Sequence, residues 1–90
     1  MKVIWAAGAL ADYRGWQAQN PRMAGKIDRL IADIKRSPFS GIGKPEPLRQ
    51  NMAGLWSRRI TEEHRLVYRV SGKRREDRRL GILQCHFHYR

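Results

Sequence analysis

The sequence has one cysteine, few acidic residues and no long apolar run. Cys85 alone cannot form an intramolecular disulfide or a cysteine-based zinc site, so a reducing cytoplasm is the expected compartment. No stretch reaches the roughly 18 to 20 apolar residues of a transmembrane helix. The apolar start at 3–11 resembles a short signal peptide but continues into a helical pattern. We therefore expect no membrane-spanning segment, and we do not expect a membrane to be the partner of this chain.

Motifs for a cofactor or a metal are also missing. The run Gly41-Ile42-Gly43-Lys44 is too short for a P-loop. His86 and His88 lie two residues apart and share one face of a strand, but no third ligand is in register with them. We therefore predict neither a cofactor nor a metal.

Basic residues are abundant: 19 lysines and arginines face 8 acidic residues, which gives a net charge of +11 and a pI near 11.1. Such an excess attracts polyanions over long range and releases counterions on binding. Judged by charge alone, nucleic acid is the first candidate partner and an anionic membrane the second, and an acidic protein fits the same charge equally well. The 90 residues suit one small domain, 1–90, whose 41% of hydrophobic residues suffice for a core.

The first half of the chain predicts a strand and two helices. Contiguous apolar residues indicate a strand at Lys2–Ala6. A helix is expected over Gly8–Gln19 and a second over Pro21–Arg36, because Asn20 is a good N-cap residue before a proline. The second helix has an apolar stripe at helical spacing: Met23, Ile27, Leu30, Ile31 and Ile34.

The second half predicts a long connection, Phe39–Gly54, and three strands. Alternating β-branched and aromatic residues indicate strands at Leu55–Ile60, His64–Val70 and Leu80–Phe87. In the last of these, we expect the side chains of Leu80 and Ile82 on one face, opposite to Leu83, Cys85 and Phe87.

This order of elements predicts an α+β fold. An N-terminal strand and two helices precede a three-stranded antiparallel meander, and the helices pack on one face of a mainly antiparallel sheet. Alternation places Leu66 and Tyr68 on the covered face, and Arg65 and Arg69 on the open one.

Polar residues that fit metal-free RNA cleavage come from three segments expected to meet on the open face. The reaction needs a base for the 2′-hydroxyl, cations for the phosphorane and an acid for the leaving 5′-oxygen. Carboxylates, basic side chains and a histidine provide these groups. The candidates are Lys44, Glu46, Arg49, Arg59, Glu63, Arg65, His88 and Tyr89. From composition alone, a solvated face of a non-catalytic RNA-binding or ribosome-binding module remains an alternative.

The chain contains four motifs of interest: Gly43-Lys44-Pro45-Glu46-Pro47-Leu48, Trp56-Ser57-Arg58-Arg59-Ile60, Glu63-His64-Arg65-Leu66-Val67-Tyr68 and His88-Tyr89. Together they resemble the motifs of the YoeB (Txe) family, in the RelE toxin superfamily. The similarity extends through most of the chain. It implies a ribosome-dependent mRNA interferase that cuts mRNA in the ribosomal A site. It also implies an acidic antitoxin of the YefM type, and the formation of toxin homodimers. A ParE-like gyrase toxin is a further alternative, but it does not call for Glu46, Arg65 and His88 together.

The resemblance also implies roles for individual residues. Glu46 would be the general base, His88 the general acid, and Arg65 would hold the scissile phosphate. Lys44, Arg59, Glu63 and Tyr89 would assist by position and charge.

The chain departs from the family pattern at three places. Position 49 is arginine where lysine is usual, the Ser71–Arg79 connector is longer and more basic, and Arg90 follows the His-Tyr pair.

Overall fold

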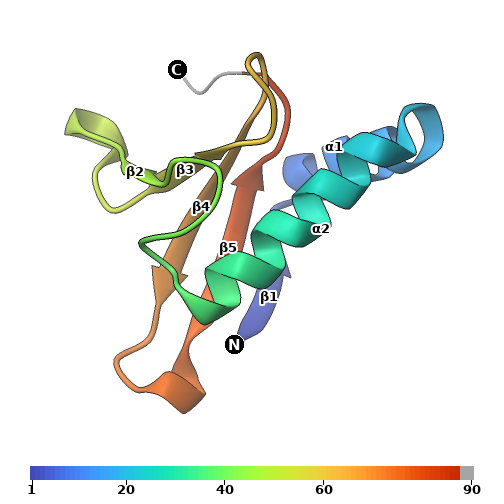
Figure 1. Cartoon of the computed structure of the whole chain (residues 1–90). Coiled ribbons are helices and arrows are strands. Elements are labelled where there is room, and N and C mark those ends of the chain that lie inside the picture. Colours follow the sequence, from blue (N-terminus) through green and yellow to red (C-terminus); the bar gives the residue numbers. More distant parts are fainter. Residues whose placement is uncertain (88–90) are drawn as a thin grey trace.

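The computed structural model describes residues 1–87 as a five-stranded sheet with two helices on one face (Figure 1). In chain order the elements are β1 (Lys2–Trp5), α1 (Ala7–Gln19), α2 (Pro21–Arg36), β2 (Glu46–Pro47), the 3₁₀ turn η1 (Gln50–Met52), β3 (Trp56–Arg59), β4 (Arg65–Ser71), the 3₁₀ turn η2 (Arg75–Asp77) and β5 (Arg79–Gln84). Neither helix in this part of the chain has the length and apolar character needed to cross a membrane.

The strand order is β1-β5-β4-β3-β2. β1 pairs with β5 in parallel, and every other neighbouring pair is antiparallel. The predicted α+β class is confirmed, but the predicted number of strands is too low, because β2 lies inside what was expected to be a plain connection. A two-residue strand shows no alternation in the sequence, and Pro47 is tolerated there because β2 is an edge strand.

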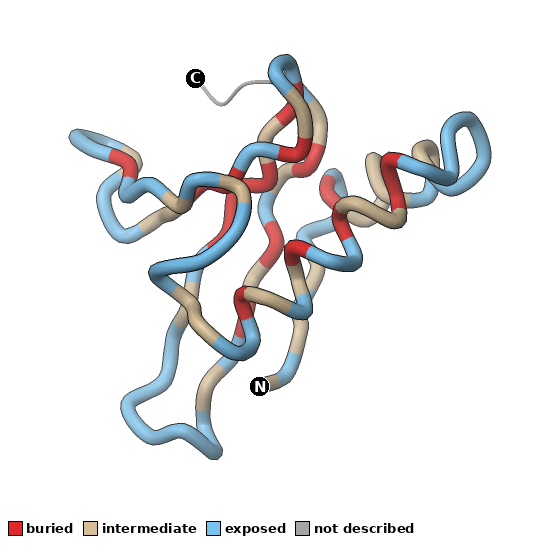
Figure 2. Tube along the Cα trace, in the orientation of Figure 1, coloured by how far each residue is buried: buried red, intermediate tan, exposed pale blue. Residues whose placement is uncertain are grey.

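The core lies between α2 and the sheet. Figure 2 shows buried residues along α2 and in the strands that it covers. The predicted apolar stripe supplies Met23, Ile27, Leu30 and Ile34, which are 0–6% exposed, while Ile31 is only partly buried. The strands, the residue that follows β3 and the segment after β5 add to this core: Ile60, Leu66, Tyr68, Leu80, Ile82 and Cys85.

The pairing of β4 with β5 contains a β-bulge that corrects one expectation. Val67 pairs with Gln84 but Tyr68 pairs with Ile82, so Leu83 is an extra residue in β5. β5 then ends at Gln84, and Cys85 is fully buried in the core with Ile82 instead of lying on the opposite face. Strict alternation fails here because it assumes an uninterrupted strand.

Candidate active site on the open sheet face

Three of the predicted site residues lie on the sheet face that the helices leave open. Glu46 pairs with Ser57, and two residues further along β3 Arg59 pairs with Arg65. Paired residues share a face, and so do residues two apart on one strand. Glu46 and Arg59 are therefore diagonal neighbours, with Cα atoms about 7–8 Å apart, and Arg59 lies directly opposite Arg65.

Arg65 is fixed by the turn that joins β3 to β4. Its Nη1 donates hydrogen bonds to the carbonyl oxygens of Thr61 at 2.7 Å, Glu62 at 2.9 Å and His64 at 3.2 Å. The turn itself is held by the Thr61 hydroxyl, which accepts from the backbone N–H of Glu63 and of His64. Among residues 1–87, no partner is found for Nε or Nη2 of Arg65. One edge of a rigidly held guanidinium is thus left for a ligand.

Acidic residues of the same turn compensate part of the positive charge. The Arg59 guanidinium lies 3.9 Å from the Glu62 carboxylate, and both side chains are well exposed. Glu63 is also exposed, and its carboxylate lies 3.6 Å from Nε2 of His64. The structure therefore places Glu63 beside the buried His64 at the turn and not beside Glu46. Surface pairs of this kind contribute about 0–1 kcal/mol.

Lys44 and Arg49 flank β2 on either side. Lys44 is exposed and has a positive φ of 51°, after Gly43 with φ 78°. The backbone N–H of Arg59 donates to the carbonyl oxygen of Gly43 at 2.7 Å, which attaches this bend to the end of β3. Arg49 is exposed and lines a hollow of about 280 Å³ together with Glu46.

The end of the described chain is anchored at Arg65. The backbone N–H of Arg65 donates to the carbonyl oxygen of Phe87 at 3.0 Å, and the N–H of Phe87 donates to Nδ1 of His64 at 2.8 Å. The ring of His86 lies against Trp16, with centroids 5.0 Å apart. The remaining two predicted site residues, His88 and Tyr89, lie outside the described residues.

Arg58, the neighbour of Arg59, makes an extensive buried network that was not predicted. Its side chain is fully buried and donates to the carboxylate of Asp33 at 2.5 Å and to the hydroxyl of Tyr68 at 3.2 Å. It also donates to three carbonyl oxygens of the segment 37–43, which we call the strap: Ser37 at 2.6 Å, Ser40 at 2.7 Å and Ile42 at 3.1 Å.

The strap leads directly to Lys44 and Glu46, so by holding the strap Arg58 helps to position the segment that follows it. Alternation along β3 could have revealed this role from the sequence. If Ser57 and Arg59 point to the open face, Trp56 and Arg58 must point to the helices. An arginine at a core-facing position requires buried partners.

This network shifts two pKa values. Hydrogen bonding to Arg58, and then to the backbone N–H of Ile42, lowers the pKa of Asp33. Burial raises the pKa of Tyr68 although Arg58 opposes that shift. Tyr68 also donates from its hydroxyl to the carbonyl oxygen of Pro38 at 2.7 Å, and so adds a second attachment of the strap to the sheet.

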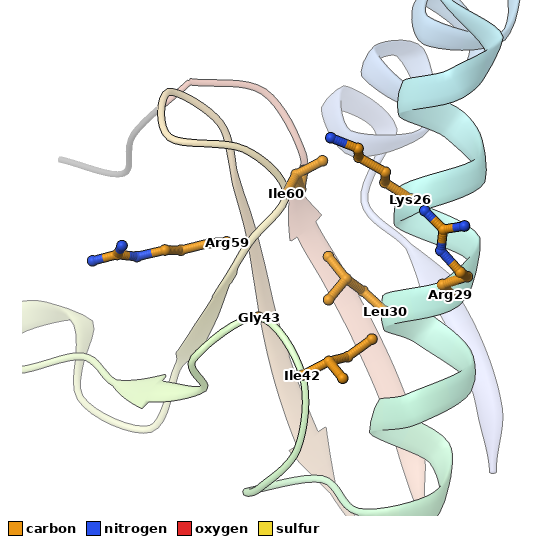
Figure 3. Close-up of a pocket in the computed structure, with 7 residues that line it drawn as sticks. All are labelled: Lys26, Arg29, Leu30, Ile42, Gly43, Arg59 and Ile60. Carbon is orange, nitrogen blue, oxygen red and sulfur yellow. The ribbon is translucent and has the colours of Figure 1, made fainter.

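A separate hollow of about 230 Å³ lies on the helix side of the sheet, between α2 and the strap (Figure 3). Leu30, Ile42 and Ile60 form its apolar part, and Lys26 and Arg29 contribute from α2. Gly43 and Arg59 also line it, although the Arg59 side chain points away from the other lining residues in Figure 3. Neither Glu46 nor Arg65 lines this hollow, so we do not place the candidate chemistry there.

In the part of the chain that the structure describes, no group of three His, Cys, Asp or Glu side chains could hold a metal ion. On the open face, Glu46 lies near the paired Arg59 and Arg65, and the chain end is anchored to the backbone of Arg65. Together with the net charge of +11, this defines a small basic α+β domain suited to a phosphate-containing ligand.

Comparison with known proteins identifies the family. Residues 5–89 match the family model described as YoeB-like toxin of bacterial type II toxin–antitoxin system. Toxin YoeB of Escherichia coli K12 is 52% identical over 99% of this chain and 100% of its own length. The YoeB/ParE toxin from Agrobacterium tumefaciens has 55% identity and a TM-score of 0.93, covering 99% of this chain and 100% of that one. A YoeB chain from a YoeB–YefM complex of Staphylococcus aureus has 39% identity and a TM-score of 0.87, with 99% and 98% covered.

The chain belongs to the YoeB-like toxins of bacterial type II toxin–antitoxin systems.

Proposed function

We propose that this toxin is a ribosome-dependent mRNA endoribonuclease that cleaves A-site mRNA by metal-independent acid–base catalysis and so inhibits translation. In the reaction, the 2′-oxygen of one nucleotide loses its proton and attacks the adjacent phosphorus. The bond from phosphorus to the 5′-oxygen breaks, and that oxygen receives a proton. The products are a 2′,3′-cyclic phosphate and a 5′-hydroxyl end.

Glu46 is the proposed general base, Arg65 the phosphate-binding cation and His88 the proposed general acid. Arg59 adds positive charge opposite Arg65, and Lys44 does so at the entry to β2. Arg49 and Tyr89 position RNA. Glu63 acts through His64 at the turn and is a positioning residue in this scheme.

The observation that carries the proposal is the anchoring of the chain end to β4. The hydrogen bond from the Arg65 N–H to the Phe87 carbonyl oxygen brings the segment that precedes His88 to the proposed phosphate-binding residue. Glu46 reaches the same sheet face from the other side of β3. The proposed base, phosphate-binding cation and acid belong to three segments that are far apart in the sequence.

The proposed partners follow from the charge and from the relatives. The Staphylococcus aureus YoeB chain forms a complex with YefM, and a YoeB dimer from the same organism is also known. We propose that this chain pairs with an acidic YefM-like antitoxin, to which its charge of +11 is complementary, and that it also forms homodimers.

Expression of the chain in bacteria, followed by mapping of mRNA 5′ ends, tests the proposal. Wild type should arrest growth and produce cuts inside translated codons. Glu46→Gln, Arg65→Lys and His88→Ala should each reduce cutting by about 10²-fold or more, since each removes a group that acts in the transition state.

Arg69→Lys is the matched control for Arg65→Lys. Arg69 is exposed on the same strand but pairs with Gly81 and makes no ion pair with residues 1–87. Cutting by Arg69→Lys should therefore stay near the wild-type level. Undiminished cutting by Arg65→Lys and His88→Ala would refute the site assignment. Intact mRNA with ribosome-bound wild-type protein would instead indicate a non-catalytic binding module.

A further inference from the structure

The connector between β4 and β5 forms a second basic surface, far from the candidate active site. Residues 71–79 contain five basic and two acidic side chains, a net charge of +3 in nine residues. Figure 1 shows this segment, drawn in orange, at the end of the molecule opposite the turn between β3 and β4. β4 spans the distance between the two ends, and its seven residues correspond to about 20 Å.

The connector is folded and not merely charged. The backbone N–H of Asp77 donates to the carbonyl oxygen of Arg74 at 3.0 Å, and the N–H of Arg78 donates to the carbonyl oxygen of Arg75 at 3.3 Å. Gly72, at φ +100°, allows the chain to approach the carbonyl group of Asp77, where a Cβ atom would lie 2.5 Å from the oxygen. Arg75 of η2 and the flanking Arg74 and Arg78 are therefore held on an ordered turn.

This turn meets the last turn of α2 around a hollow of about 390 Å³. Four basic residues line it with Met1: Lys35 and Arg36 from α2, and Arg75 and Arg78 from the connector. Of these, only Arg36 makes an ion pair with residues 1–87, at 3.2 Å from Asp33. The nearby Glu76 and Asp77 make none with those residues. We call these four basic side chains the distal patch.

We propose that the distal patch binds the phosphate backbone of double-stranded RNA. Arginine forks match phosphate oxygens in geometry, and a concave group of them holds adjacent phosphates. No aromatic side chain lines the hollow, so it offers no stacking surface for the bases of a single strand. Duplex RNA is recognised largely by its shape and backbone, which needs no such surface.

Other polyanions fit less well. Among residues 1–87, the exposed large apolar side chains are Ile4, Phe39, Ile42, Leu83 and Phe87, and none of these lines the hollow. An acidic helix would lack an apolar groove at this place, and an anionic membrane would lack an inserted side chain. If the proposed function holds, the inference deepens it: a ribosomal RNA helix on the distal patch would fix the orientation of the open face toward mRNA about 20 Å away.

The test compares two double variants of the full chain. Arg75→Gln with Arg78→Gln removes two charges from the patch, and Arg14→Gln with Arg22→Gln removes two exposed charges from α1 and α2. Binding to a 20-base-pair RNA duplex, fully 2′-O-methylated to prevent cleavage, is measured by fluorescence anisotropy over a range of salt concentrations. The same-length single strand and phosphatidylglycerol vesicles serve as competing probes.

The patch variant should bind the duplex about tenfold more weakly than wild type at about 0.1 M salt, and its salt slope should fall by about 1.8, since each lost phosphate contact contributes about 0.9. The control variant should change much less in both. Equal losses in the two variants would show that net charge alone drives binding and would overturn the proposal. The proposal would also be overturned if the patch variant lost binding only to the vesicles or only to the single strand.

Cleavage on ribosomes separates this inference from the proposed function. The patch variant should raise KM for ribosomes severalfold and leave kcat unchanged, because its residues are remote from the reacting atoms. If wild type cuts no mRNA, the proposed function fails but the duplex measurement still decides the role of the patch. Normal duplex binding by the patch variant refutes the patch, whatever the cleavage result.

Discussion

Replacement of Arg58 by methionine should strongly destabilise the protein. The guanidinium is fully buried and donates to a carboxylate, a tyrosine hydroxyl and three carbonyl oxygens of the strap. Methionine keeps much of the apolar volume but leaves these acceptors without their donor. Removal of one member of such a buried charged network costs about 3–5 kcal/mol. That is a large fraction of the roughly 5–15 kcal/mol that stabilise a typical domain.

The assay is urea denaturation of the purified full chain, followed by circular dichroism, with a thermal melt in parallel. For a chain of this size, each kcal/mol lowers Tm by about 4–8 °C, so a decrease of at least about 12 °C is expected. Arg59→Met is the matched control, because Arg59 is the next residue of β3 and its only described ion pair is the exposed contact with Glu62. Its loss should cost no more than about 1 kcal/mol.

A second substitution at position 58 tests whether positive charge alone is sufficient. Arg58→Lys keeps the positive charge, but an ammonium group lacks the planar set of donors with which the guanidinium contacts five acceptors. Arg58→Lys should therefore recover only part of the stability that Arg58→Met loses. A loss below about 1 kcal/mol in Arg58→Met, or one equal to that in Arg59→Met, would refute the reasoning. The strap would then be held to the sheet by other contacts, such as that between Tyr68 and Pro38.

Three further predictions concern single positions. Arg58 lowers the pKa of Asp33, so the ionised carboxylate stabilises the fold above the unfolded-state pKa of about 3.9, and this stabilisation is lost as the pH falls through the folded-state pKa. Asp33→Asn should therefore be less stable than wild type at neutral pH. It should also lose less stability than wild type on acid titration. Burial raises the pKa of Cys85 to about 12, so thiol reagents at pH 8 should label it only at the rate of unfolding, and fast labelling of native protein would contradict its burial. Gly43→Ala should lower the free energy of unfolding by more than about 1 kcal/mol, since φ is +78° and the added Cβ would lie 2.8 Å from the Leu30 side chain. Gly15→Ala on α1, where the added Cβ meets no atom within 4 Å, should raise it by about 0.5–1 kcal/mol in the same denaturation assay.

The helices and the long strands could be predicted because their periodicity extends over many residues. The stripe on α2 and the alternation along β4 each repeat often enough to exclude other elements. β2 could not be predicted, because two residues carry no period. The burial of Cys85 was also missed, since it depends on the bulge at Leu83 and on where β5 ends, and both are set by pairing with β4. Local patterns do not contain such tertiary information.

The candidate site also has parts that the sequence predicts and parts that it does not. The choice of catalytic residues from the sequence motifs stays a prediction, whereas alternation correctly placed Arg65 on the open face, opposite Arg59. The partners of Arg58 could not be predicted, because Asp33, the strap and Tyr68 come from three parts of the chain that meet only in the fold. The same applies to the hydrogen bond between Arg65 and Phe87, which joins residues 22 positions apart.

The pairing of Arg59 with Arg65 supports the proposal that this face binds a ligand and is not only a solvated surface. Like charges directly opposite on neighbouring strands destabilise a sheet, and either position would be more stable with a neutral or acidic residue. The turn relieves part of the repulsion, through three carbonyl oxygens at Arg65 and through Glu62 at Arg59. A bound phosphate would relieve the remainder, since it places negative charge between the two guanidinium groups. An anion such as sulfate should therefore raise the Tm of wild type more than that of Arg59→Gln, and equal shifts would show that the pair is merely tolerated.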